Sequence, residues 1–257
     1  MLDQELFSGM LRAYNPNYEN EFLSYENQDH YQNNLAKLGI NWEYASKKIY
    51  YKYNSLGHRS CELSELTSDY LLFAGCSVTE GVALANEDIY CNLVASKHKT
   101  QYYNLGVGGS CPTISAKNML AFLSLVQKHP YAIIVQWPYF YRYFRVSKGY
   151  FISHLTPAGE ELEYYNFMQK ERDAYRFNVL ERAYFFHYLK NINYRGQIIE
   201  MFSQTEDEIT EIVETAGVSV QSNYFMTPNM IDYARDLGHP GSKTHKRYAA
   251  KILELLK

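Results

Sequence analysis

The stretch Asp69-Tyr70-Leu71-Leu72-Phe73-Ala74-Gly75-Cys76-Ser77-Val78-Thr79-Glu80-Gly81 decides how this chain folds. Its apolar part is typical of a buried parallel strand, which is a continuous apolar run bounded by turn residues. The strand ends at Gly75, and Ser77 stands where the chain passes into a helix. In open α/β sheets, ligand sites form at this exit from the carboxyl end of a strand.

Strands and helices continue to alternate through the rest of the chain. Apolar runs predict further strands at residues 101–105, 131–137, 197–202 and, as a short fifth strand, 218–220. The spacing of apolar residues predicts helices at about 87–97, 113–128, 163–191, 207–216 and 243–256. Such alternation forms right-handed βαβ units around a parallel sheet. The predicted fold class is therefore α/β, a three-layer α/β/α sandwich with a central, mostly parallel sheet.

Two regions differ in character from this alternating pattern. Residues 1–50 are polar and aromatic with poor periodicity, so we expect an amino-terminal arm or short helices packed on the domain, with Trp42 and Tyr44 as anchors. Residues 138–162 are an aromatic excursion after the third strand. No composition break marks a linker, so residues 51–257 are expected to form one domain.

Composition excludes several classes of partner. The net charge of -3 gives no basic face for nucleic acid. No apolar run approaches the roughly 18 residues of a membrane span. Met1 to Glu5 lack the basic and apolar regions of a signal peptide, so a cytoplasmic location is expected. The 26 tyrosines suit a surface that stacks on sugars or lines an interface, or simply fill half-buried positions.

The cysteines predict neither a metal site nor disulfides. They are widely spaced and contain no C-x-x-C pair: Cys61, Cys76, Cys91 and Cys111. This spacing disfavours zinc, and a chain of this size needs no disulfides. We therefore expect reduced thiols and no metal.

Ser77 can be a nucleophile only if a base removes its proton; otherwise it is a helix cap, since serine is a preferred N-cap. A base and its orienting carboxylate are offered by Asp236-Leu237-Gly238-His239-Pro240-Gly241. The alternative for this loop is a capped helix start with an exposed histidine. His245, on the following helix, is expected to be a surface or packing residue.

The glycines of Gly106-Val107-Gly108-Gly109 follow the second strand. They allow backbone N–H groups to point into a site, as an oxyanion hole requires, and a phosphate cradle would use the same feature. The spacing matches neither G-x-G-x-x-G nor the P-loop signature. The phosphate interpretation also gives the Asp236–His239 loop no role.

In this order, the motifs resemble those of the SGNH/GDSL hydrolase superfamily. Residues 75–81 resemble its nucleophile block, usually Gly-Asp-Ser-x-Thr-x-Gly, and residues 104–110 resemble its second block. Asp236 and His239 match its closing Asp-x-x-His. Residues 54–59 are similar to a segment that precedes the first strand in some branches. The resemblance covers roughly residues 54–136 and 228–256.

The resemblance implies a mechanism. Ser77 would be the nucleophile, His239 the general base and then acid, and Asp236 its orienter. The backbone N–H groups of Ser77 and Gly109 would bind the oxyanion. The implied activity is that of an esterase or deacetylase that works through an acyl-enzyme, without metal or cofactor, on a small-molecule or carbohydrate ester.

The sequence departs from the family pattern at two places. Cys76 replaces the Asp before the serine, which takes no part in proton transfer. The third block, usually Gly-x-Asn-Asp, is absent, and the third strand ends Gln136-Trp137-Pro138-Tyr139-Phe140-Tyr141-Arg142. The family's Asn donates to the oxyanion, and removing one such donor lowers turnover by about 10²–10³.

This end of the third strand leaves two alternatives. Replacement donors are expected from Gln136, Tyr139 or Arg142, and these three with Trp137 are the candidate substrate-binding residues, because aromatic faces suit sugar rings. The alternative to an enzyme is a catalytically weak or silent SGNH-fold binding or structural protein in a larger assembly.

Overall fold

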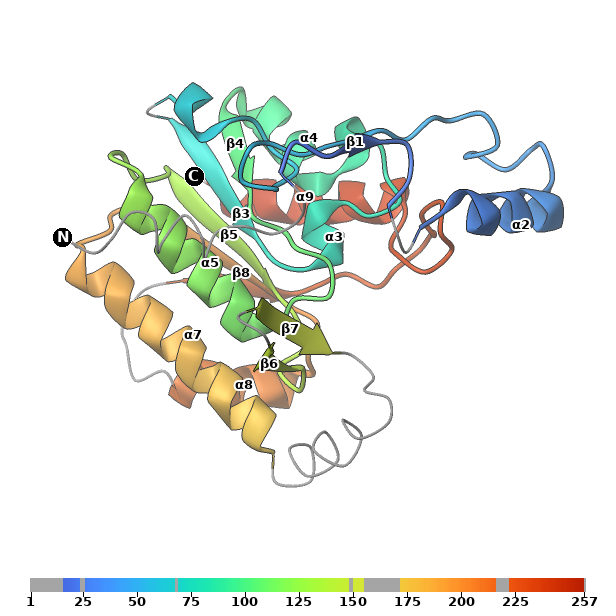
Figure 1. Ribbon diagram of the computed structural model, residues 1–257. Coiled ribbons are helices and arrows are strands. Elements are labelled where there is room, and N and C mark those ends of the chain that lie inside the picture. Colours follow the sequence, from blue (N-terminus) through green and yellow to red (C-terminus); the bar gives the residue numbers. More distant parts are fainter. Residues whose placement is uncertain are drawn as a thin grey trace.

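The computed structural model describes residues 16–23, 26–67, 69–147, 150–154, 172–215 and 222–256. Its centre is a five-stranded sheet of order β4-β3-β5-β8-β9, in which all neighbouring strands are parallel (Figure 1). The strands are β3 (Tyr70–Ala74), β4 (Gln101–Asn104), β5 (Ala132–Trp137), β8 (Gln197–Phe202) and β9 (Asn223–Met226). The predicted α/β class with a parallel sheet is confirmed.

Helices cover both faces of this sheet (Figure 1). One face packs against α4 (Tyr90–His98) and α9 (Ser242–Leu255). The other packs against α5 (Pro112–Leu125), α7 (Asp173–Asn191) and α8 (Glu206–Thr215). The short helix α3 (Ser77–Glu80) follows β3 directly. None of the helices in the described ranges is both long and apolar enough to span a membrane.

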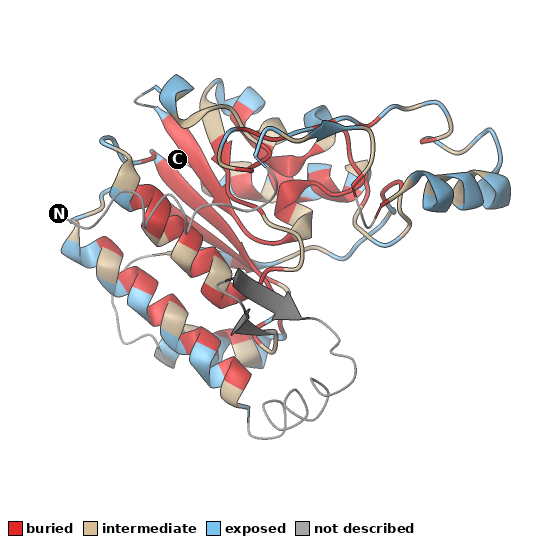
Figure 2. Ribbon diagram, in the orientation of Figure 1, coloured by how far each residue is buried: buried red, intermediate tan, exposed pale blue. Residues whose placement is uncertain are grey.

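The two apolar layers explain why the strands read as continuous apolar runs. In β3, Leu71 and Phe73 join the core beneath α4 and α9, whereas Leu72 and Ala74 join the core beneath α5 and α7. Every residue of β3 and of β5 is buried (Figure 2). A strand covered on both faces needs apolar side chains at every position, which is why strict alternation is absent.

The strand order places β3 at a topological switch point. The connection through α4 leads from β3 to β4 on one side, and α5 then leads to β5 on the other side of β3. Because the connections diverge there, a crevice opens beyond the carboxyl ends of the strands. The residues that follow β3, beginning with Gly75, lie at this crevice.

Some predicted elements differ from the structure. The strand expected at 218–220 lies outside the described residues, and the fifth strand found is β9, at 223–226. The helix expected from 163 is described only from Asp173 onward. Within the aromatic excursion, β6 (Tyr143–Ser147) and β7 (Tyr150–His154) form an antiparallel pair that the sequence analysis did not predict.

Residues 16–50 contact the sheet domain at several points, and residues 1–15 lie outside the described ranges. β1 (Glu19–Asn20) pairs with β2 (Tyr51–Lys52), and Tyr44 is fully buried. Glu26 and Arg235 form a buried ion pair between this segment and the loop before α9. By contrast, α2 (Gln28–Leu38) has no buried residue and projects from the body (Figure 2). Short 3-10 turns lie at Leu63–Glu65 and Asn86–Asp88.

Candidate active site

Ser77 is the first residue of α3 and is half-buried. A Cβ atom on Gly75 would lie 2.8 Å from the Gln136 carbonyl oxygen and would collide with the Thr79 hydroxyl. Only glycine therefore lets the chain turn so closely against β5. This turn places the Ser77 hydroxyl beyond the end of the sheet, where its Oγ lies 2.8 Å from Nε2 of His239.

The Asp236–His239 loop presents the imidazole to Ser77. Asp236 Oδ1 accepts hydrogen bonds from the N–H groups of Gly238 and His239, both at 3.0 Å, and its Oδ2 contacts His239 Nδ1. Because the carboxylate accepts the Nδ1 proton, the lone pair of the neutral ring lies on Nε2, facing Ser77. Burial raises the pKa of Asp236. The hydrogen bonds from His239 and the two N–H groups lower it by more than burial raises it, so the pKa of Asp236 lies below its usual value.

Contacts outside the motif fix both ends of this loop. Asp232 accepts from the N–H groups of Lys243 and Thr244, both at 2.8 Å, and so caps the start of α9. Across the loop, the Ala234 N–H donates to the His239 carbonyl at 2.8 Å. Sequence reasoning did not find Asp232, whose only signal was its place ten residues before a helix.

The glycine turn of residues 106–110 is tied to a buried carboxylate. Glu80, fully buried, accepts from the Gly108 N–H at 2.7 Å and from the Tyr53 hydroxyl. Gly109 has a φ of +74°, a conformation that suits glycine. Within the described part of the chain, nothing accepts a hydrogen bond from the N–H of Gly109 or of Ser77. Two N–H groups near the site are therefore available for a ligand.

At the end of β5, the structure corrects one expectation. Trp137 is completely buried, and its Nε1 donates to Glu200 at 2.7 Å. The prediction that Trp137 binds substrate is therefore wrong, because its ring belongs to the core beneath α5 and α7. Gln136 points to the opposite face, where it is also buried and accepts from the Thr79 hydroxyl at 3.0 Å.

Tyr139 and Arg142 lie in the turn after β5. Tyr139 is 51% exposed. The Arg142 guanidinium lies 5.7 Å from the centre of its ring and donates to the Ser110 carbonyl at 2.9 Å. Of the four residues singled out at the end of the third strand, Tyr139 is therefore exposed and Arg142 is bonded to the glycine turn.

The remaining candidate groups serve packing. His245 is buried, and its Nδ1 accepts from the Tyr90 N–H at 3.1 Å. Burial lowers its pKa to about 3, so it remains neutral. The Cys76 thiol is buried, 4.0 Å from the Ser77 hydroxyl. In the described ranges all four cysteines are free, and no three His, Cys, Asp or Glu side chains are grouped as metal ligands would be.

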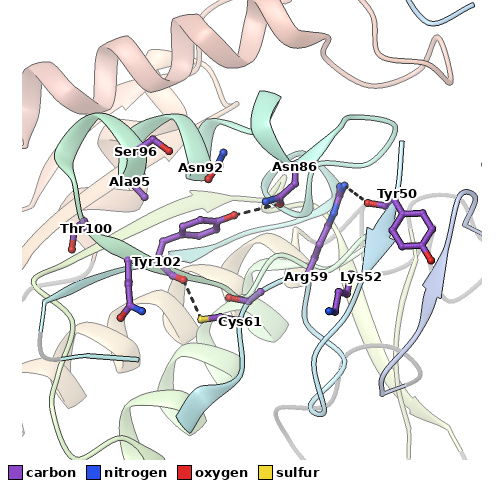
Figure 3. Close-up of a pocket in the computed structure, with 12 residues that line it drawn as sticks. Tyr50, Lys52, Arg59, Cys61, Asn86, Asn92, Ala95, Ser96, Thr100 and Tyr102 are labelled. Carbon is purple, nitrogen blue, oxygen red and sulfur yellow. Dashed lines mark hydrogen bonds between the residues drawn. The ribbon is translucent and has the colours of Figure 1, made fainter. Parts of the chain in front are cut away.

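A separate hollow of about 450 Å³ lies between the edge strand β4 and α4 (Figure 3). There the Tyr102 hydroxyl donates to the Asn86 side chain at 3.3 Å. Its lining comes from four segments: Tyr50, Lys52, Arg59, Ser60, Cys61, Asn86, Asn92, Ala95, Ser96, Thr100, Gln101 and Tyr102. None of the three residues around the Ser77 hydroxyl contributes to it, so this hollow is a different surface.

Comparisons with known proteins find similarity in structure only. No family model matches the sequence, and no curated protein matches it. Similar solved structures include an acetyl xylan esterase from the rumen bacterium Butyrivibrio proteoclasticus, with 17% identity, a TM-score of 0.46, and 74% of this chain and 63% of that one covered. A carbohydrate esterase is similar at 16% identity and a TM-score of 0.45, over 76% of this chain and 66% of that one.

A third similar structure is AlinE4, an SGNH-hydrolase family esterase, with 11% identity, a TM-score of 0.38, and 74% of this chain and 98% of that one covered. The chain spans less than two thirds of the length of the first two proteins. At these identities the likeness concerns the fold alone.

Proposed function

We propose that the protein is a serine ester hydrolase that works through an acyl-enzyme. The observation that carries this proposal is the chain of contacts from the Ser77 hydroxyl to His239 Nε2, at 2.8 Å, and from His239 Nδ1 to Asp236. A weak hydroxyl nucleophile needs this arrangement of base and orienting carboxylate.

The reaction follows from the positions of the donors and acceptors. Ser77 Oγ attacks the ester carbonyl carbon while its proton passes to His239 Nε2, and the carbonyl π electrons move to the oxygen. When the oxyanion collapses, the C–O bond to the alcohol breaks, and the alcohol takes the proton from His239. Water then repeats both steps, releasing the acid and restoring Ser77.

The developing oxyanion would be bound by backbone N–H groups. Those of Ser77 and Gly109 have no acceptor among the described residues, which supports this role. The glycine turn is held by Glu80 through the Gly108 N–H, so the donor next to it needs little reorganisation during the reaction. This is the basis of electrostatic preorganisation.

The proposed substrate is an acylated carbohydrate. Two exposed tyrosines are the candidates for sugar contact: Tyr139, in the turn after β5, and Tyr233, whose backbone pairs with that of Pro240, the residue after His239. Aromatic faces of this kind suit the apolar face of a sugar ring. The substrate class is tested by comparing the rate of acetate release from acetylated xylan fragments with that from an aryl acetate. A Tyr139→Ala variant that hydrolyses the sugar ester more slowly, but the aryl acetate at the wild-type rate, would support the proposed substrate.

The test of the nucleophile is hydrolysis of a short-chain aryl acetate. We expect Ser77→Ala and His239→Ala each to lower kcat by about 10⁴-fold or more, because each removes a group that acts only with the other. Matched controls are Ser64→Ala and His30→Ala, which change exposed residues. Equal activity in the wild type and the Ser77→Ala variant would refute the assignment.

Labelling with a fluorophosphonate separates this function from the alternative of a silent binding protein. The probe phosphonylates an activated serine, so we expect a single adduct on the peptide that contains Ser77. His239→Ala should label far more slowly. Folded wild-type protein that takes up no probe would favour the binding or structural alternative.

A further inference from the structure

The end of β5 lacks the side-chain amide donor that the family resemblance leads one to expect, and the structure narrows what replaces it. Trp137 donates to Glu200 inside the core, and Gln136 is buried below α3, where its Oε1 accepts from the Thr79 hydroxyl. The next polar side chains along the chain are those of Tyr139, Tyr141 and Arg142, and the Tyr141 hydroxyl donates to Glu208 at 2.7 Å. Among the described residues, Arg142 is the one of these three with a hydrogen bond to the glycine turn.

Arg142 lies against the turn that supplies a proposed oxyanion donor. Its Nη1 donates to the Ser110 carbonyl at 2.9 Å, and Ser110 directly follows Gly109. The Ser110 hydroxyl in turn donates to the Gly75 carbonyl at 3.0 Å, two residues before Ser77. The guanidinium is therefore linked through Ser110 to the turn that carries Gly109 and to the backbone at Gly75, which leads into Ser77.

The backbone that carries Arg142 is held in place from the other side. The Asn178 side chain on α7 donates to the carbonyl oxygens of Phe140 and Arg142, both at 2.7 Å. Asn178 is itself buried. A side chain mounted on so firmly held a turn can present a donor in a fixed place, as preorganised stabilisation requires.

The guanidinium has donors that the protein does not use. An arginine side chain carries five N–H donors. In the described part of the chain, Arg142 has one acceptor, the Ser110 carbonyl, and its Nε is buried without a partner. None of the ion pairs formed among these residues includes Arg142. The buried Nε has no surface that a ligand could contact, whereas the remaining Nη protons of the guanidinium have no acceptor among the described residues and can bind one that a ligand brings.

We propose that Arg142 donates a hydrogen bond to the oxyanion in place of the absent amide, an inference that rests on the proposed function. As the Ser77 Oγ–carbon bond forms, the carbonyl π electrons become a negative charge on oxygen, and the guanidinium N–H binds that charge without transferring its proton. A hydrogen bond between a cation and an anion is stronger than one from a neutral amide. Arg142 would thus supply a stronger hydrogen-bond donor to the oxyanion than the side-chain amide whose place it takes.

The test compares kcat and KM for aryl acetate hydrolysis by the wild type, Arg142→Met and Arg142→Lys. We expect Arg142→Met to lower kcat by about 10²–10³ with KM changed less than about threefold, because the bond forms only in the transition state. Arg142→Lys should lose at least about tenfold, since a lysine lacks the planar fork that serves two acceptors. The matched control is Arg176→Met on α7, whose exposed side chain forms an ion pair with Asp173.

Chemical rescue distinguishes a donor from a residue that merely holds the turn. Millimolar guanidinium ion should restore part of kcat in Arg142→Ala and leave Ser77→Ala inactive. A kcat for Arg142→Met within about threefold of wild type would overturn the proposal. So would a rise in KM alone, which would instead indicate that Arg142 binds an anionic part of the substrate.

The two proposals fail in different ways. If Ser77→Ala keeps full activity, the hydrolase function itself is wrong. If Ser77→Ala is inactive and the Arg142 variants are fully active, the proposed hydrolase function is supported and the proposed role of Arg142 is refuted. Should Arg142→Met fail to fold, as judged by circular dichroism, Arg142→Lys decides, and a kcat equal to wild type there refutes the proposal.

Discussion

Asp236 and Glu80 are two carboxylates near the same crevice, and they differ in where their partners come from. Asp236 is half-buried and bonds within its own loop, to His239 three residues later. Glu80 is fully buried, and its partners Gly108 and Tyr53 lie 28 and 27 residues away. The comparison suggests a division of labour, in which short-range contacts set the protonation chemistry and long-range contacts set the position of the groups.

The larger loss of activity is expected from Asp236→Asn, which changes the short-range contact between Asp236 and His239. Asp236→Asn keeps an oxygen for the backbone N–H groups but offers an amide N–H to His239 Nδ1, which favours the wrong imidazole tautomer. We expect kcat to fall by about 10²–10⁴ while the free energy of unfolding changes by less than about 1.5 kcal/mol. Steady-state kinetics and urea unfolding measure the two quantities. Asp29→Asn on the exposed α2 is the control, and a near-normal kcat for Asp236→Asn would contradict the division.

A smaller loss of activity is expected from the long-range side. Glu80→Ala leaves the Gly108 N–H and the Tyr53 hydroxyl without their acceptor, so we expect about 2–4 kcal/mol of lost stability and at least about tenfold lower kcat. Glu80→Gln retains an acceptor oxygen and should recover most of the activity. If Glu80→Ala lowered kcat as strongly as Asp236→Asn without a loss of stability, Glu80 would belong to the chemistry rather than to the positioning.

The same distinction explains what could be predicted from the sequence. The apolar run of β3, the glycine turn at Ser77 and the Asp236–His239 spacing are local patterns, and each indicates its structure directly. Glu80 carried no local signal, because its role depends on which distant turn packs against α3. The fold class follows from the order of strands and helices, whereas the pair of strands β6 and β7 does not.

The error at Trp137 has a similar cause. Successive side chains of a strand point to opposite faces, so Gln136 and Trp137 at the end of β5 could not both face one site. The sequence showed an aromatic residue near the expected third block, but not which layer of the sandwich its ring would enter. That depends on the packing of α5 and α7, which joins residues far apart in the chain.

The smallest expected effect concerns stability alone and compares two histidines six residues apart. His239 contacts Asp236 in its own loop, whereas His245 accepts from the N–H of Tyr90, 155 residues away. Burial lowers the pKa of His245 to about 3, against an ordinary value of 6.5. Between these two pH values the unfolded chain therefore binds a proton at His245 that the folded chain does not bind. The stability contributed by the neutral ring is complete above pH 6.5 and is lost as pH falls towards about 3.

His245→Asn keeps an acceptor for the Tyr90 N–H and removes this titration. At neutral pH we expect the variant to be less stable than wild type by about 1–3 kcal/mol, through lost packing of the ring. The difference should shrink by about 1.4 kcal/mol for each pH unit below the ordinary histidine pKa, because one proton is linked to unfolding in the wild type only. His58, buried with a pKa lowered to about 3, is present in both proteins and cancels. Urea unfolding of both proteins between neutral pH and about pH 3 measures the difference in the free energy of unfolding. A difference that stays constant with pH would show that His245 does not remain neutral in the folded protein. Above pH 6.5, kcat of the variant should be nearly that of wild type if the long-range contact acts on position alone.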